Sequence, residues 1–145
     1  MVAIKRLTAS DAEKIAQCVR GVYGQNYAHE LFYDLPRLTV ALETGDIMSV
    51  GALNDAGEVI AHMAMTHRGA DSTPESGSTV VTSSARGGGL AWKVGAELIS
   101  WCKELGFSGF LHYPTTEHHI MQRQSVNQGF VTGVMLGYIP VGTTI

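Results

Sequence analysis

The fold is decided by one stretch of sequence, Val80-Val81-Thr82-Ser83-Ser84-Ala85-Arg86-Gly87-Gly88-Gly89-Leu90-Ala91, in which three consecutive glycines join a predicted strand to a predicted helix. Glycines allow a turn whose backbone N–H groups converge, and the N-terminus of the following helix adds unpaired donors and the positive end of its dipole. Such a turn can hold a phosphate group without side chains. A pyrophosphate is the ligand that it suits best.

Three phosphate-binding motifs compete for this turn. A Walker A loop is excluded because no Lys-Ser/Thr pair follows the glycines. A GxGxxG dinucleotide turn fails because Trp92 stands where the third glycine would allow close packing of helix and strand. The remaining motif, Arg/Gln-x-x-Gly-x-Gly/Ala, is matched at every defined position by residues 86–91.

Hydrophobic periodicity on both sides of the turn predicts alternating strands and helices. Strands are expected at Val2–Leu7, Asp46–Leu53, Glu58–Thr66, Ser78–Ser83, Phe107–Tyr113 and Val131–Ile139. Helices are expected from the Thr8-Ala-Ser-Asp11 cap to Tyr23, from Pro36 to Gly45, from Leu90 to Leu105 and over Thr116–Asn127. This order implies a mixed α/β sheet, an antiparallel N-terminal meander followed by two β-α-β crossovers, with helices on both faces. With 145 residues, the chain is expected to form a single domain, 1–145.

Both the motif and the element order resemble the GNAT superfamily of acetyl-CoA-dependent N-acetyltransferases, over essentially the whole chain. In that family the strand before the motif offers backbone groups to pantetheine, the motif's amides hold the CoA pyrophosphate, and the next strand splays away to form a cleft. The resemblance implies transfer of an acetyl group from acetyl-CoA, the co-substrate, to a primary amine by direct attack. It places Val81 and Thr82 against pantetheine, and Arg86, Gly87, Gly88, Gly89, Leu90 and Ala91 against pyrophosphate.

Composition argues against several other classes of protein. Ten Lys and Arg against thirteen Asp and Glu give a formal charge of -3, without the basic excess of a nucleic-acid binder. Cys18 and Cys102 are isolated thiols without CxxC spacing, which fits a reducing compartment better than a disulfide framework. No signal-peptide h-region is evident, and no window reaches the roughly 18 apolar residues of a membrane span. We therefore expect a cytoplasmic protein.

Acyl transfer needs a group that takes the amine proton and a group that protonates or stabilises the leaving thiolate. In many GNAT enzymes a tyrosine four residues before a Gly-Phe pair protonates the thiolate, but Ser125 stands at that position here and is too weak an acid to replace it. The catalytic candidates are therefore Tyr138 as the acid and His118 or Glu75 as the base. Each candidate could instead have a purely structural role. Tyr138 would then be a half-buried tyrosine, His118 a histidine hydrogen-bonded to backbone at the start of a helix, and Glu75 a solvated surface residue.

The segment from Tyr23 to Asp34 mixes aromatic and polar side chains, as expected where a small ligand is enclosed and oriented. By the GNAT resemblance this segment walls the acceptor side of the cleft, with Tyr27 and Glu30 as substrate residues. The alternative is a connection between helices whose aromatic rings pack onto the core. No metal is expected, because the histidines form neither an HExxH motif nor a pair with cysteines.

The expected partner is a small-molecule or peptide amine, with no nucleic acid and no membrane, and a homodimer is left open. Two other functions also remain open. One is an acyl-CoA sensor that kept the phosphate turn and lost the acid, as Ser125 permits. The other is an interaction protein whose turn holds no ligand. Binding of CoA would exclude the interaction protein, and acetyl transfer at a catalytic rate would exclude the sensor.

Overall fold

The strands and helices follow one another in the predicted order. A computed structural model describes residues 1–67, 73–114, 119–127 and 129. The strands are β1 (Ala3–Leu7), β2 (Ile47–Leu53), β3 (Val59–Thr66), β4 (Glu75–Val81) and β5 (Leu111–His112). The helices are α1 (Ala12–Tyr23), α2 (Leu35–Thr44), α3 (Leu90–Glu104) and α4 (His119–Asn127), with short 3-10 turns η1 (Ala9–Asp11), η2 (Glu30–Tyr33) and η3 (Ser83–Ala85).

The five described strands form one sheet in the order β1-β2-β3-β4-β5. The first four strands pair antiparallel, whereas β4 and β5 pair parallel across the crossover helix α3. The predicted mixed sheet is therefore confirmed. Because β4 leads directly into α3, the glycine turn lies at the carboxyl end of a strand that borders the parallel part of the sheet.

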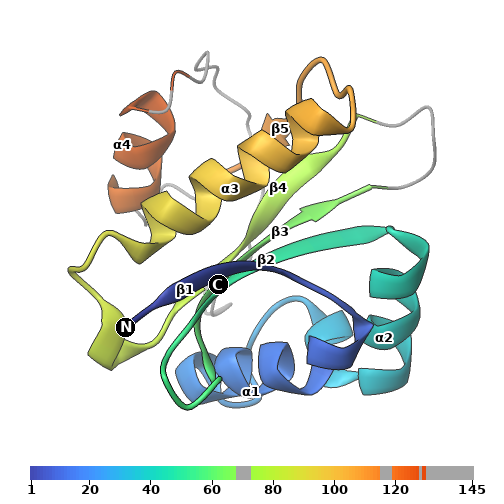
Figure 1. Ribbon diagram of the computed structural model, residues 1–145, viewed down its shortest axis with the longest axis vertical. Helices are drawn as coiled ribbons and strands as arrows, with labels where there is room; N and C mark the ends of the chain where they lie inside the picture. The colour runs from blue at the N-terminus through green and yellow to red at the C-terminus, as the bar shows by residue number, and fades with distance from the viewer. Residues whose placement is uncertain (68–72, 115–118, 128, 130–145) are drawn as a thin grey trace.

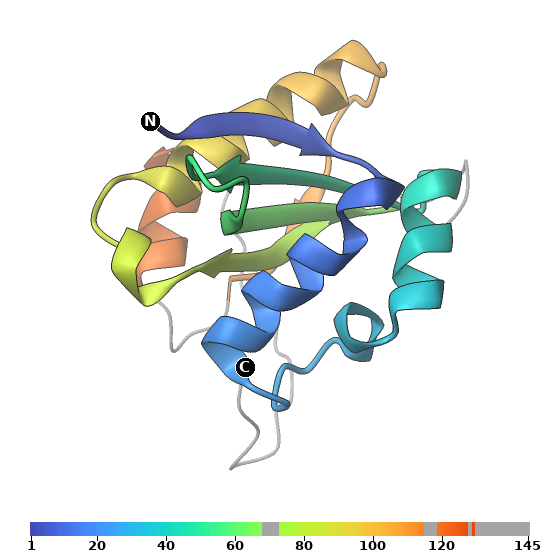
Figure 2. The same ribbon diagram turned by 60° about the horizontal axis from the view of Figure 1, so that its bottom comes forward.

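Helices cover both faces of the sheet. Helices α1 and α2 lie on one face and α3 lies on the other, with α4 on the same side as α3 (Figures 1 and 2). The core under α1 and α2 contains fully buried Ile15, Phe32 and Leu38. The core under α3 contains Val94 and Leu98 together with the methionines of β2 and β3. Among the described helices, none is long and apolar enough to span a membrane.

The helix boundaries follow local chemistry. Thr8 and Asp11 form a capping box, in which the Thr8 amide donates to Asp11 Oδ2 at 3.1 Å, so the predicted cap is confirmed. The side chain of Asp34 caps α2 by accepting from the Arg37 amide at 3.1 Å. Gly45 ends α2 with φ 79°, a left-handed conformation that suits glycine.

Two predicted strands have different bounds in the structure. The strand expected at Ser78–Ser83 begins earlier, at Glu75, because Glu75 pairs with Thr66 of β3, and it ends at Val81, shortly before η3 begins at Ser83. The strand expected at Phe107–Tyr113 is reduced to Leu111–His112, the two residues that pair with β4. Apolar composition predicted both strands, but pairing with a neighbour sets their length. The predicted strand Val131–Ile139 and the start of the helix predicted at Thr116 lie outside the described residues.

Candidate functional site

The glycine turn runs directly into the N-terminus of α3. Gly87 and Gly89 have φ values of 82° and 69°, in the left-handed region that favours glycine, and Gly89 is the residue that precedes the first turn of the helix. No side chain caps α3 at this end. The first N–H groups of a helix have no partner within it, so they are directed, with the positive end of the helix dipole, toward the turn. This arrangement suits a bound phosphate.

Arg86 adds positive charge to the turn. Its side chain is exposed, and its Nε donates to the Val81 carbonyl oxygen at 3.3 Å, so the guanidinium lies along the end of β4. Burial raises the pKa of Tyr23, at the end of α1, and the charge of Arg86 opposes that rise. The positive charge of Arg86 therefore acts on Tyr23, the first residue of the aromatic segment.

Strands β4 and β5 separate soon after they begin. They pair only at Glu75 with Leu111 and at Ser76 with His112. Within the described residues, the edge of β4 that faces β5 has no strand partner from Gly77 to Val81. The opening between the strands therefore begins at Ser76 and leads toward the glycine turn.

A β-bulge distorts β4 inside this opening. On β3, His62 pairs with Val80 and Ala64 pairs with Gly77, so Ser78 and Thr79 together lie opposite the single residue Met63. Ser78 has φ 50°. The buried hydroxyl of Thr79 has no hydrogen-bond partner among the described residues, and such an atom is one that a ligand's polar group would satisfy.

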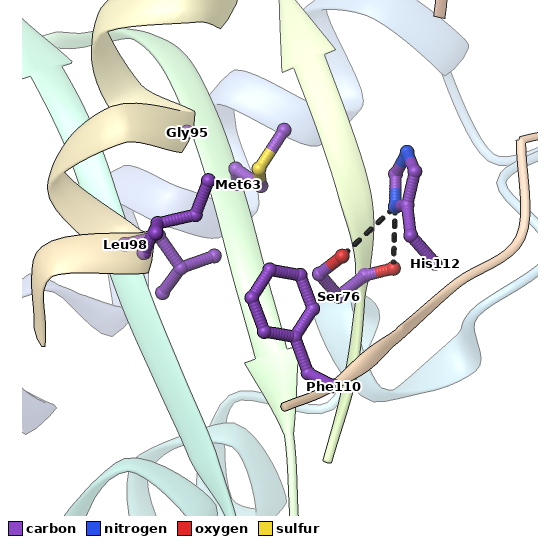
Figure 3. Close-up of a pocket in the computed structure, with 7 residues that line it drawn as sticks. Met63, Ser76, Gly95, Leu98, Phe110 and His112 are labelled. Atoms are coloured by element: carbon purple, nitrogen blue, oxygen red, sulfur yellow. Dashed lines mark hydrogen bonds between the residues drawn. The ribbon is translucent and has the colours of Figure 1, made fainter. Parts of the chain in front are cut away.

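A serine and a histidine lie side by side where the opening begins (Figure 3). His112 Nδ1 lies 2.8 Å from Ser76 Oγ and 3.0 Å from the Ser76 carbonyl oxygen. Because a carbonyl oxygen only accepts, this geometry places a proton on Nδ1. The two side chains border a cavity of about 10 Å³ that is otherwise lined by Met63, Gly95, Leu98, Ile99 and Phe110. This volume holds about one water molecule, so the cavity is not a substrate pocket.

Several solved structures share the fold of this chain. The PaiA N-acetyltransferase of Thermoplasma acidophilum in complex with coenzyme A superposes with a TM-score of 0.74, at 16% identity, over 94% of each chain. The fold is that of the GNAT acetyltransferases. Glucosamine-6-phosphate N-acetyltransferase of Arabidopsis thaliana has a TM-score of 0.72 at 16% identity, covering 97% of this chain and 99% of its own. An aminoglycoside 6'-N-acetyltransferase of Acinetobacter baumannii has a TM-score of 0.72 at 13% identity, covering 97% of both chains.

No family model and no curated protein sequence matches the chain. The similarity to these solved structures is therefore one of tertiary structure.

The predicted CoA-binding residues lie on one continuous path in this GNAT fold, from the end of β4 through η3 to the first turn of α3. Thr82 donates to the Ile60 carbonyl oxygen through both its amide, at 3.0 Å, and its hydroxyl, at 3.2 Å. The Val81 carbonyl oxygen accepts from Arg86. A pantetheine contact at either residue that used these groups would have to replace an existing hydrogen bond. Leu90 is buried under the turn, and Gly87, Gly88 and Gly89 are exposed.

The structure places one of the three catalytic candidates. Glu75 is exposed and lies at the first pair between β4 and β5, where the opening begins. Because successive residues of a strand face opposite sides, Glu75 lies on the face opposite Ser76. His118 and Tyr138 lie outside the described residues. Ser125 is buried in α4, and its hydroxyl donates to the Met121 carbonyl oxygen at 2.9 Å.

The two predicted acceptor residues have different environments. Tyr27 is 9% exposed and packs in the core, with its ring centroid 4.7 Å from that of Tyr23 and 5.8 Å from that of Phe32. Burial raises its pKa to about 12. Glu30 is exposed at the start of η2. The aromatic rings of this segment therefore pack onto the core, as the structural alternative holds, while Glu30 faces solvent.

The sequence alone assigned no role in the site to Ser76, Ser78, His62 or His112. Ser78 carries no sequence signal for its bulge, and His62 resembles any histidine within a strand. Ser76 and His112 could have been associated only through the parallel register of β4 and β5. Among the described residues, no three His, Cys, Asp or Glu side chains are grouped to hold a metal ion.

Proposed function

We propose that this protein transfers an acetyl group from acetyl-CoA to a primary amine by direct attack of the amine on the thioester. The observation that carries this proposal is the glycine turn at the uncapped N-terminus of α3, next to the unpaired edge of β4. The turn suits a pyrophosphate, and the open strand edge suits an extended amide-containing arm such as pantetheine. Both ligand groups occur in one molecule of CoA.

Each part of the site then has a chemical role. The amides of residues 86–91 hold the pyrophosphate, and β4 aligns the arm so that the thioester lies near the start of the opening. The amine nitrogen attacks the carbonyl carbon, the new C–N bond forms, and the C–S bond breaks with its electron pair on sulfur. Glu75 takes the proton that the amine loses, directly or through a water molecule. His112 places a second proton-accepting group at the same point, on the opposite face of the sheet.

The acceptor enters, in this proposal, on the side of the aromatic segment. Glu30 offers an exposed carboxylate that would attract a cationic amine. Tyr27 packs behind Glu30 in this proposal. Its ring is buried, so its hydroxyl does not face solvent. A small-molecule amine and a peptide N-terminus both have this chemistry.

A specific observation favours a second function, that of an acyl-CoA sensor with little turnover. The Ser125 hydroxyl, at the position of the thiolate-protonating tyrosine in many GNAT enzymes, is engaged with the backbone of its own helix. A sensor would bind acetyl-CoA as tightly as an enzyme does, so binding and turnover must be measured separately.

We expect acetyl-CoA to stabilise the fold, because it binds the native cleft and not the unfolded chain. At a concentration of about 100 times its dissociation constant it should add roughly 2.7 kcal/mol, which raises the unfolding midpoint of a domain of this size by about 5–10 °C. Thermal unfolding with and without acetyl-CoA measures this shift, and release of free thiol with a panel of primary amines measures transfer. An unchanged midpoint at millimolar acetyl-CoA would contradict the proposal, whereas a raised midpoint without thiol release would favour the sensor.

We expect Glu75→Gln to lower kcat by about 100-fold while the affinity for acetyl-CoA stays unchanged, because the substitution removes a proton acceptor from the start of the opening. Ser125→Ala is the matched control. Its hydroxyl is bonded to Met121 and has a pKa too high to supply acid at neutral pH, so activity should change by less than about threefold. Steady-state kinetics of thiol release measures both variants. A large loss for Ser125→Ala, or none for Glu75→Gln, would show that these roles are wrong.

A further inference from the structure

Ser78 holds a backbone conformation that serine rarely adopts. Its φ of 50° makes it the one non-glycine residue in the left-handed region among those that the structure describes. A side chain in this region is strained, so neighbouring contacts have to maintain the conformation. The strained residue belongs to the bulge that faces the opening between β4 and β5.

A buried histidine holds Ser78 from β3. His62 is 1% exposed, and its Nδ1 lies 3.1 Å from the Ser78 carbonyl oxygen. The carbonyl oxygen only accepts, so Nδ1 carries the proton and donates. Burial lowers the pKa of His62 to about 4, so the ring is neutral at pH 7 and Nε2 accepts from the hydroxyl of buried Ser49 at 3.2 Å. The neighbours of the ring thus fix its tautomer and its orientation.

A tyrosine lies beside the side chain of Ser78. Burial raises the pKa of the Tyr27 hydroxyl, and the nearby Ser78 side chain opposes that rise. Tyr27 is stacked on Tyr23 and packs against Phe32, and the edge of Phe32 meets the His62 ring at a centroid distance of 5.5 Å. Phe32 therefore contacts both Tyr27 and His62, the two residues that lie next to Ser78. We name the three residues Tyr27, His62 and Ser78 the bulge clamp.

We propose that His62 and Tyr27 are positioning residues, which keep Ser78 left-handed so that the unpaired edge of β4 is correctly directed at the thioester arm of acetyl-CoA. This inference rests on the proposed function. A bulge re-aims the backbone groups of its strand, and an error of about 1 Å in placing a reacting group can cost about 100-fold in rate. The clamp also links the acceptor segment, through Tyr27, to the strand that binds the cofactor arm.

A pair of substitutions at His62 separates positioning from packing. In His62→Asn the side-chain amide nitrogen lies as many bonds from Cα as Nδ1 does, so it can still donate to the Ser78 carbonyl oxygen. His62→Leu fills a similar volume without a donor. We expect His62→Leu to weaken acetyl-CoA binding and to lower kcat/KM, each on the order of tenfold or more, and His62→Asn to keep most of both. Calorimetric titration and thiol-release kinetics measure the two quantities.

Adding Ser78→Gly to His62→Leu is the decisive variant. Glycine occupies the left-handed region without strain, so it no longer needs the clamp. We expect the double variant to recover most of the binding that His62→Leu loses. If His62 only stabilised the core, a glycine added to a strand would lower stability further and would restore nothing, and that result would overturn the proposal.

Two further measurements cover the cases in which a variant does not fold or the protein does not bind CoA. Tyr27→Phe removes one hydroxyl and keeps the ring packing. The loss of acetyl-CoA affinity that it causes should disappear when Ser78→Gly is added, because glycine adopts the left-handed conformation without the clamp. The HN–Hα coupling and the backbone chemical shifts of Ser78 report its φ directly, with or without ligand. A wild-type protein that binds no acetyl-CoA would overturn the proposed function. A Ser78 that stays left-handed in both His62→Leu and Tyr27→Phe would overturn the clamp.

Discussion

Gly89→Val should weaken the binding of acetyl-CoA on the order of 100-fold. An added Cβ would meet nothing within 4 Å, so lack of space is not the obstacle. The obstacle is the backbone, because φ is 69° at the residue that precedes α3 and a β-branched side chain strongly disfavours that conformation. A turn that relaxes to ordinary φ values would rotate the first N–H groups of α3 away from the pyrophosphate.

Gly88→Ala is the matched control within the same turn. The φ of Gly88 lies outside the left-handed region, and an added Cβ would make an ordinary contact with the Ala85 carbonyl oxygen at 3.8 Å. We expect its affinity for acetyl-CoA to fall by less than about threefold. Calorimetric titration compares the two variants after thermal unfolding has shown that both are folded. Equal losses would mean that the motif spacing is fortuitous and that the phosphate site lies elsewhere.

Acid should begin to destabilise the protein above the pH range in which most carboxylates titrate. Burial lowers the pKa of His62 to about 4 from an ordinary value of about 6.5, so the unfolded chain binds a proton in this range that the folded chain does not. The stability that neutral His62 contributes is therefore fully present above about pH 6.5, and it is lost as the pH falls toward 4. The expected loss is about 2 kcal/mol at pH 5 and about 3 kcal/mol near pH 4.

Urea unfolding at about pH 7 and about pH 5 measures this loss. His62→Asn removes the titrating ring, so its stability should change little between the two pH values, even though it is lower than that of the wild type at pH 7. His29→Asn, at an exposed imidazole, is the control for the loss of a histidine as such. The pKa values of the Asp11 and Glu104 carboxyl groups are lowered, so these groups lose their contribution to stability only below their ordinary values near 4. They therefore do not obscure the difference in stability between pH 7 and pH 5. A wild-type protein equally stable at both pH values would contradict a buried neutral His62.

Part of the site could be predicted from local sequence alone. Three glycines after a β-branched run specify a turn that enters a helix, and the positive φ values of Gly87 and Gly89 show why glycine is needed at those two positions. The alternation of strand and helix patterns specified a mixed sheet with helices on both faces, because amphipathic periodicity depends on neighbours a few residues away. The capping box at Thr8 and the C-terminal glycine of α2 are local in the same way.

The remainder depends on contacts between residues distant in sequence. Glu75 joins β4 only because Thr66 pairs with it, and β5 shrinks to two residues because only Leu111 and His112 reach β4. The likeness to solved acetyltransferases likewise lies in tertiary structure, at identities of 13% to 16% for the three compared here. At such identities, burial pattern and topology persist while most individual side chains differ.

By itself the sequence determined the glycine turn and the order of the elements, since each is encoded within a few adjacent residues. The tertiary structure alone decided that Ser78 adopts a left-handed conformation in a bulge, that the buried His62 ring contacts its carbonyl oxygen, and that Ser76 and His112 meet where β4 and β5 part. The physical reason is that serine, histidine and tyrosine have no strong preference for such roles. Their conformations and protonation are set by burial and by hydrogen bonds to partners distant along the chain, such as Ser76 and His112, which are 36 residues apart.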